Sequence, residues 1–297
     1  MSSPFQAWTL PPDFHLPEGD LAVSTGDPSL AYPRLSLPQW DRLTRYLRRH
    51  REDHLLSSPL RKIVQSLDRV AGRFLDSDDP MHEESLEGLM RFAGYSRPMA
   101  RAVLRGMARG WRQDSLWDLV RSQFSAPEVL DGFWPGRGGG ETRALGFPLT
   151  FHLGASTVPG VATSSLIRGL LVKSAVILKP GRGDVVLPVL FAAGLQEEDP
   201  DLAGSVGVLY WPGDDQERME PVLSRVDLVV AYGSDATVSW VRSRLPPHVP
   251  LRAYRHRMGF ALVGREALTE EGDDGGSRRG GWWVAQRAAR SVALFDQ

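Results

Sequence analysis

The sequence places a lysine where an anionic ligand could bind. Lys179 follows the apolar run at residues 175–178 and precedes Pro-Gly-Arg at residues 180–182. Such a run is typical of a strand buried in a parallel sheet, and ligands bind at the carboxyl ends of these strands in open α/β sheets. Positive charge on a constrained turn there would suit a phosphate group. A solvated lysine in an ordinary loop has the same spacing, so the spacing alone leaves both interpretations open.

The segment before this strand has the order of elements found in phosphate-binding units: a strand, a turn of small residues and a helix. Residues 154–159 are small and turn-forming, and they lead from an apolar run into a helix that Thr163 or Ser164 could cap. Unpaired N–H groups and the helix dipole attract anions at such a helix start. Neither GxGxxG nor GxxxxGK(S/T) is present, so no standard phosphate-binding motif supports the assignment.

A second turn repeats this order at residues 232–235, Tyr-Gly-Ser-Asp. Its N–H groups and the Ser234 hydroxyl could hold a pyrophosphate. A plain helix N-cap by Ser234 or Asp235 would have the same sequence, and it is the more common situation. Two turns of this kind predict that both face one crevice.

Other residues that could do chemistry are absent or ambiguous. The chain has no cysteine, which excludes disulfides, thiolate metal sites and a thiol nucleophile within these residues. His50 and His54 could bind a metal from one helix face, but a solvated, charge-rich face is the favoured interpretation. His256 could be a general base, although a structural role is favoured. GxSxG and HExxH motifs are missing, which argues against the hydrolases that use them.

Composition indicates an ordinary globular protein. Hydrophobic residues make up 42% and charged residues 24%, and a net charge of −1 gives no reason to expect a nucleic-acid partner. No apolar run approaches the roughly 20 residues of a membrane helix, and the first residues lack the apolar core of a signal peptide. We therefore expect a cytoplasmic protein without a membrane span.

The elements that must position the two turns fall into three predicted regions. Residues 1–38 are rich in proline and predict an extended arm. Residues 39–136 have apolar residues at three-and-four spacing and predict an α-helical region. Residues 137–297 predict a nucleotide-binding domain, which begins with a glycine-rich hinge at residues 137–140.

Strands and helices alternate after the hinge. We expect strands at 145–155, 175–179, 205–211 and 227–232, and helices at 163–174, 184–196, 217–225 and 235–245. Repeated βαβ units imply a parallel sheet. A strand pair at 251–254 and 260–263 and a final helix from Trp282 complete the prediction. Trp282 and Trp283 could face a partner, but core packing is the favoured interpretation.

Several segments resemble, in the same order, the acyl-CoA reductases of the LuxC type within the aldehyde dehydrogenase superfamily. They cover most of residues 85–297 and comprise GYSRPMARAVL (94–104), ETRALGFPLTFHLGASTVPG (141–160), SLIRGLLVKSAVILKPGRGD (165–184), VLYWPGDD (208–215), VVAYGSDATV (229–238), YRHRMGFALVGREAL (254–268) and ARSVALFDQ (289–297).

The resemblance implies an α/β fold, in which an aldehyde-dehydrogenase-like, Rossmann-type parallel sheet domain is preceded by an α-helical N-terminal region. It also implies reduction of a fatty acyl thioester, from CoA or a carrier protein, to an aldehyde with NADPH as cofactor. The acyl group is carried on a cysteine during this reaction. A metal is not implied.

The resemblance also assigns site residues. Lys179 matches the superfamily lysine that contacts the adenosine ribose, and Arg182 would suit the 2′-phosphate of NADPH. Gly233 and Ser234 match the turn that opens the helix below the pyrophosphate. The predicted cofactor-binding residues are Ser156, Lys179, Gly181, Arg182, Gly233 and Ser234.

Two departures from the family pattern matter. Thr157 stands where the family usually has asparagine in a GNVPG turn that stabilises the oxyanion; its hydroxyl could still donate. The family's segment continues from FDQ into glutamine, glycine and the catalytic cysteine. We therefore expect the nucleophile to lie beyond Gln297, the catalytic domain to be missing and this chain alone to be inactive.

Two alternatives remain open: a non-catalytic dinucleotide-binding or partner-binding subunit, and a fragment of a short-chain acyl-CoA or acyl-phosphate reductase. The expected partners are an acyl-CoA or acyl-protein thioester and an acyl-transferring or acyl-activating protein. A homo-oligomer is expected for the full-length form. The acyl chain length and any link to luminescence are not encoded in these residues.

Overall fold

The computed structural model describes residues 3–16, 20–24, 28–136, 138–255, 261–268 and 280–292, with the side chains of residues 216, 217 and 292 left out. At its centre lies a sheet with the strand order β11-β10-β7-β8-β9-β2. Five of these strands are parallel: β7 (Leu149–Leu153), β8 (Ala175–Lys179), β9 (Val206–Leu209), β10 (Leu228–Tyr232) and β11 (Leu251–Tyr254). This is the predicted parallel α/β sheet.

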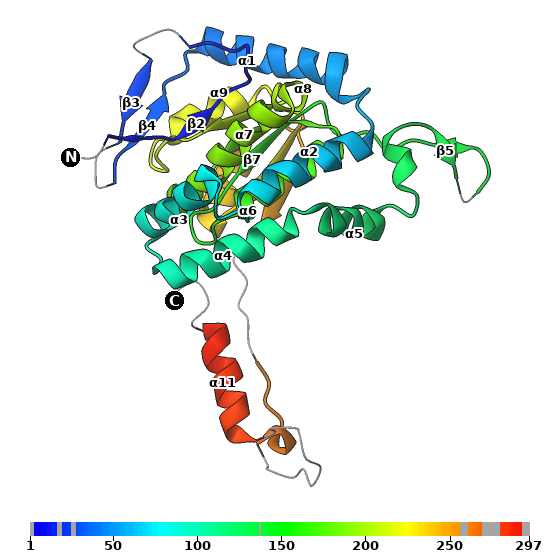
Figure 1. Cartoon of the computed structure of the whole chain (residues 1–297). Helices are drawn as coiled ribbons and strands as arrows, with labels where there is room; N and C mark the ends of the chain where they lie inside the picture. The colour runs from blue at the N-terminus through cyan, green and yellow to red at the C-terminus, as the bar shows by residue number, and fades with distance from the viewer. Residues whose placement is uncertain are drawn as a thin grey trace.

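The helices between the strands cover both faces of the sheet. Four of them have the bounds α6 (Val161–Leu171), α7 (Val186–Glu198), α9 (Glu220–Leu223) and α10 (Asp235–Arg244), and the short α8 (Pro200–Ala203) follows α7. Helix α7 is apolar on nearly all sides because it is enclosed between β9 and the N-terminal helices (Figure 1).

Strand β7 is shorter than the predicted strand at 145–155. It begins only at Leu149, because Pro148 has no N–H to donate to the neighbouring strands. Leu145 and Phe147, which the prediction included, are exposed.

The N-terminal helices extend the same core. Helix α1 (Leu37–His50) runs into a π-helical turn, η1 (Arg51–Leu55), and packs on the sheet beside α9. Helices α2 (Leu60–Arg73) and α3 (Pro80–Ala93) pack outside α6 and α7, with α4 (Arg97–Gly110) and α5 (Gln113–Gln123) beyond them (Figure 1). The helical region and the sheet share one continuous hydrophobic cluster.

Aromatic rings mark the junction between the helical region and the sheet layer. Phe74 lies 5.6 Å from Trp111 and 6.0 Å from Phe191, measured between ring centroids. All three side chains are fully buried or nearly so. Offset and edge-on ring pairs of this kind add about 1 kcal/mol each beyond the burial of their area.

The N-terminal arm is built into the sheet. It contains β1 (Phe5–Gln6), β2 (Trp8–Thr9), β3 (Leu21–Val23) and β4 (Leu30–Pro33). Strand β2 pairs antiparallel with β9, while β4 lies between β1 and β3 in a small separate sheet. The arm thereby becomes an edge of the molecule next to the carboxyl end of β9.

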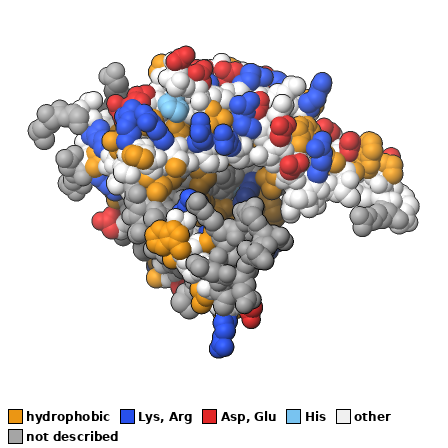
Figure 2. All heavy atoms as spheres, turned by 60° about the horizontal axis from the view of Figure 1, so that its bottom comes forward, with side chains coloured by type: hydrophobic (Ala, Val, Ile, Leu, Met, Phe, Trp, Pro, Cys, Tyr) orange, Lys and Arg blue, Asp and Glu red, His pale blue; other side chains and the backbone are white. Residues whose placement is uncertain are grey.

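Residues 138–140 of the predicted hinge lie at the tip of a short hairpin, β5 (Trp134–Pro135) paired with β6 (Glu141–Thr142). A 3₁₀ turn, η2 (Pro127–Leu130), precedes it. Phe133 and Trp134 are exposed here, and Figure 2 shows apolar side chains gathered on the projecting hairpin at its right. The boundaries of the three predicted regions stay a prediction.

Two predictions about the C-terminal part are wrong. Helix α11 (Gly281–Val292) stands away from the body (Figure 1), and Trp282 is 74% exposed, so neither it nor Trp283 packs in the core. Residues 261–263 form no strand; they are exposed, and a turn, η5 (Arg265–Ala267), follows them. Phe260 and His256 lie outside the described residues.

Within the described part of the chain, no helix is both long and apolar enough to cross a bilayer.

One ion pair ties α1 to the sheet. The Arg48 guanidinium binds both carboxylate oxygens of Asp227, at 2.6 and 3.0 Å, and Asp227 also accepts the Leu149 N–H at 2.8 Å. We expect Asp227→Ala to lower the free energy of unfolding by about 2 kcal/mol, because it leaves a cation and an N–H unpaired in a partly buried site. Urea unfolding would measure this loss.

The exposed pair of Arg49 and Asp53 on the same helical segment provides the control. Asp53→Ala should change the stability by less than about 0.5 kcal/mol. Equal losses in the two variants would show that the Asp227 contacts add nothing beyond a surface ion pair.

Candidate functional site

The strand order creates one crevice at the carboxyl edge of the sheet. From β7 the chain proceeds to β8 and β9 on one side, and then to β10 and β11 on the other. The turns after β7 and β10 therefore diverge at a topological switch point, where α/β proteins bind ligands. A cleft of about 1630 Å³ lies there.

The two predicted turns do face this cleft. It is lined by all seven predicted site residues: Ser156, Thr157, Lys179, Gly181, Arg182, Gly233 and Ser234. They come from the ends of three different strands and meet only because β7, β8 and β10 are neighbours in the sheet. The N-terminal arm also contributes to the lining, which the sequence did not predict; its residues are Val23, Ser24, Tyr32 and Arg34.

Lys179 is buried at the floor of the cleft rather than solvated. Only 5% of the residue is exposed, and its Nζ lies 5.6 Å from the ring centre of Tyr210 and 5.7 Å from that of Trp211. Burial lowers the pKa of Lys179 to about 8, although nearby Asp214 opposes the shift. Within the described part of the chain, its ammonium has no hydrogen bond or ion pair. A cation held in this way is available to an anionic or hydroxyl-bearing ligand.

The turns after β7 and β8 touch each other closely. A Cβ on Gly181 would lie 2.5 Å from Ser156 Oγ and 2.6 Å from Ser156 N. Glycine is therefore required here by the close approach of two backbones. Gly181 shapes the cleft wall, and it holds Ser156 and Thr157 at the rim, where both side chains are exposed.

Asp184 is a site residue that the sequence analysis missed. It is fully buried, and its carboxylate accepts the N–H groups of Gly160, at 2.6 Å, and Ala162, at 2.9 Å, which open α6. Burial raises the pKa of Asp184 to about 7, against these two hydrogen bonds. The group that accepts these two N–H groups is thus the chain's own Asp184 side chain, so they are not available to a ligand phosphate. Neither Thr163 nor Ser164 caps the helix; Gly160 is the N-cap, with φ of +92°.

The start of α10 is different. Ser234 is its N-cap, and the Ser234 hydroxyl accepts the Thr237 N–H at 3.2 Å, as in the ordinary-cap interpretation. Gly233, Ser234 and Thr237 nevertheless line the cleft. Among the described residues, no side-chain carboxylate accepts the N–H groups at this helix start in the way that Asp184 does at α6. Of the two helices, α10 is therefore the one placed to receive a phosphate.

Arg182 lines the cleft but already has protein partners. Its guanidinium donates to the Pro28 carbonyl of the arm and to the Tyr210 hydroxyl. Burial raises the pKa of Tyr210, and the Arg182 hydrogen bond opposes this shift. Arg182 thus joins the arm to the end of β9 while it faces the cleft.

A second buried polar group lies behind the cleft. His152 on β7 is 4% exposed, and its ring nitrogens lie 2.7 Å from Ser165 Oγ and 3.0 Å from Thr150 Oγ1. Burial lowers the pKa of His152 to about 4, so the ring is neutral near pH 7. This network fixes α6 to β7 and faces no ligand.

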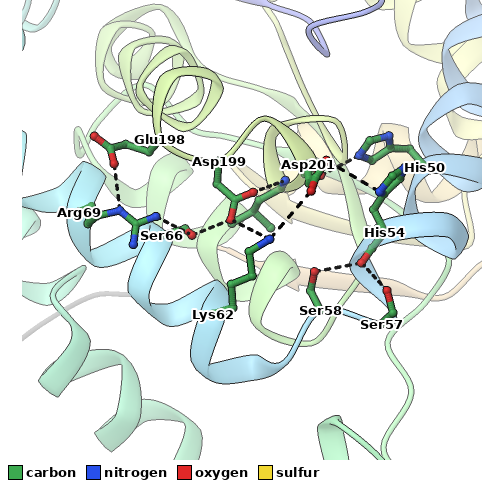
Figure 3. Close-up of polar contacts among 11 residues, drawn as sticks. His50, His54, Ser57, Ser58, Lys62, Ser66, Arg69, Glu198, Asp199 and Asp201 are labelled. Carbon is green, nitrogen blue, oxygen red and sulfur yellow. Dashed lines mark hydrogen bonds and ion pairs between the residues drawn. The ribbon is translucent and has the colours of Figure 1, made fainter.

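The histidine pair at 50 and 54 forms no metal centre. The two rings stack 4.4 Å apart, with His50 Nε2 2.7 Å from the Asp201 carbonyl oxygen and His54 Nδ1 3.8 Å from the Asp201 carboxylate. Figure 3 shows these contacts beside Lys62, which lies between Asp199 and Asp201. No group of three or more metal-ligating side chains occurs among the described residues. The pair therefore serves to join the end of α1 to α8.

Comparison with known proteins identifies the family of this chain. Residues 55–297 match the family model described as acyl-CoA reductase (LuxC). The long-chain acyl-protein thioester reductase of Vibrio harveyi is 25% identical over 251 residues, which are 82% of this chain and 50% of the relative. The chain thus spans about half the length of the curated relatives it matches.

The fold is that of aldehyde dehydrogenases. Methylmalonate-semialdehyde dehydrogenase from Oceanimonas doudoroffii superposes with a TM-score of 0.63 at 16% identity, over 84% of this chain and 50% of that one. NADP-dependent glyceraldehyde-3-phosphate dehydrogenase from Bacillus halodurans, in complex with NADP, gives 0.58 at 15% identity, over 78% and 48%. At these identities the likeness concerns the fold alone.

Proposed function

Because this chain belongs to the LuxC family of acyl-CoA reductases, we propose that its cleft binds NADPH for the reduction of an acyl thioester to an aldehyde. The observation that carries the proposal is the convergence of the turns after β7, β8 and β10 on one cleft, whose floor holds a buried lysine without an ion-pair partner among the described residues. When bound, NADPH supplies the hydride.

The residues present suit this cofactor. Lys179 offers an ammonium group to the ribose and its phosphate, and the N-terminus of α10 offers N–H groups and a positive dipole end to the pyrophosphate. Gly181 keeps the wall between them free of side chains. Tyr210 and Trp211 exclude water from the lysine, which strengthens its electrostatic attraction for a phosphate.

Thr157 is proposed as a hydrogen-bond donor to the oxygen of the reacting carbonyl. It lies at the exposed rim of the cleft on the turn that Gly181 and Asp184 hold in place. A hydroxyl placed where negative charge develops stabilises that charge.

The acyl group itself needs a thiol that these 297 residues do not contain. We propose that a cysteine from outside this sequence carries the acyl group and that this chain alone does not turn over the substrate. The complete protein is proposed to act in the cytoplasm, as a homo-oligomer, on acyl-CoA or acyl-protein thioesters delivered by an acyl-transferring or acyl-activating partner.

The lack of cysteine also favours one alternative, a non-catalytic dinucleotide-binding subunit. Both proposals require the cofactor, so binding is tested first. Fluorescence titration of the purified chain should show saturable binding of NADPH, at least about fivefold tighter than NADH, because a phosphate adds a charge-assisted contact. If the chain bound neither NADPH nor NADH, both proposals would be overturned. Addition of a separately expressed cysteine-bearing remainder of a family member should restore acyl-CoA reduction only under the reductase proposal.

A further inference from the structure

The N-terminal arm brings an unpaired arginine to the cleft. Four cationic side chains line it: Arg34, Lys179, Arg182 and Arg244. Arg244 pairs with Glu220 at 3.1 Å and stacks on the Trp240 ring, and Arg182 donates to the arm and to Tyr210. The Arg34 guanidinium has no hydrogen bond or ion pair within the described part of the chain.

The backbone around Arg34 is held firmly against the sheet. Arg34 follows β4 directly, and its N–H donates to the Asp20 carbonyl at 2.6 Å. The Tyr210 N–H donates to the Ala7 carbonyl at 3.1 Å, and the rings of Tyr32 and Tyr210 pack edge to face with their centroids 5.8 Å apart. These contacts fix the arm at the carboxyl end of β9, on the same side of the cleft as Lys179 and Arg182.

The unpaired charges of the cleft favour an anion. Its acidic lining consists of Asp214, Asp215 and Glu220. Asp215 pairs with Arg218, and Glu220 pairs with Arg244. Among the described lining residues, Arg34 and Lys179 therefore face Asp214 alone, which leaves an excess of positive charge on this wall.

We propose that Arg34 is a specificity residue, whose guanidinium binds the phosphate monoester on the adenosine ribose of NADPH. The inference rests on the proposed function and adds the arm to the binding site. A guanidinium is suited to this role because its planar fork donates two parallel hydrogen bonds to one phosphate. The guanidinium donors of Arg34 have no partner among the described residues, whereas Arg182 uses part of its own to hold the arm.

The test compares ligands with and without the 2′-phosphate on the full 297-residue chain. Affinities for NADPH, NADH, 2′,5′-ADP and 5′-AMP would be measured by calorimetry for the wild type and Arg34→Gln. We expect Arg34→Gln to weaken NADPH and 2′,5′-ADP by about tenfold and to leave NADH and 5′-AMP within about twofold. Arg34→Lys, which keeps the charge but not the fork, should give an intermediate loss.

Arg45 on α1 provides the matched control, because it is an exposed arginine that does not line the cleft. Arg45→Gln should leave all four affinities unchanged. An unchanged NADPH affinity in Arg34→Gln, or equal losses of NADPH and NADH, would overturn the inference while leaving the proposed function intact. If the wild type bound none of the four ligands, the proposed function itself would fail. Thermal melts would show that each variant is folded.

Discussion

Lys179→Met is expected to lower the affinity of the chain for NADPH by roughly 50-fold, which corresponds to about 2.3 kcal/mol of binding free energy. The ammonium lies at the floor of the cleft without a protein partner among the described residues, so its hydrogen-bonding capacity is available to the ligand. Methionine fills nearly the same volume. Because burial disfavours the charged form of Lys179 in the free protein, as its lowered pKa indicates, the variant should melt no lower than the wild type.

The pH dependence of binding separates a direct contact from a packing effect. Below its pKa of about 8 Lys179 is charged, and above it the charged fraction falls. If the ligand binds the ammonium form, the wild-type affinity should be constant near pH 7 and should fall by up to about tenfold per pH unit above 8. Lys179→Met should lack this decline.

Lys62→Met serves as the control, since Lys62 is half exposed on α2 and pairs only weakly with Asp199 and Asp201. It should bind NADPH like the wild type at every pH. A Lys179→Met variant with normal affinity would contradict the assignment of this lysine to the cofactor.

Gly181→Ala is expected to have the second largest effect. The new Cβ would approach Ser156 N and the Ala155 carbonyl carbon to 2.6 Å, which forces the two turns apart. We expect the free energy of unfolding to drop by about 3 kcal/mol, at the upper end for overpacking by one methyl group. The affinity for NADPH should fall at least about tenfold, because Ser156 and Thr157 move with the turn. Urea unfolding and fluorescence titration would measure the two effects.

Gly213 offers a matched control within the same cleft. No atom lies within 4 Å of a Cβ built on it, so Gly213→Ala should keep both stability and binding. If the two alanine variants behaved alike, the close approach of the turns would not be the reason for glycine at position 181.

Local sequence patterns predicted the parallel strands correctly where a pattern of apolar residues is compatible with only one environment. The run at residues 175–178 is apolar throughout, and β8 covers it and ends at Lys179, because a strand buried on both faces carries apolar side chains along its length. The pattern failed at residues 261–263 and at Trp282. Apolar residues there could equally face a core or solvent, and α11 stands away from the body.

The occupancy of the two helix starts could not be predicted from spacing. Residues 154–159 and 232–235 look alike in the sequence, but Asp184 enters the first from the following turn and occupies its N–H groups. That carboxylate is 24 residues from Gly160. No local pattern reports a contact that depends on how β8 and α6 pack together.

The sequence by itself determined the parallel βαβ order, the position of Lys179 at a strand end, the absence of a thiol and the family, because these depend on residue types and short spacings. Only the tertiary structure decided that the lysine is buried and has no ion-pair partner among the described residues, that Asp184 accepts the N–H groups at the start of α6, and that the arm carries Arg34 to the cleft. These three results arise from contacts between segments far apart in the chain. Whether a side chain is hydrated or desolvated, and paired or free, is decided by such contacts.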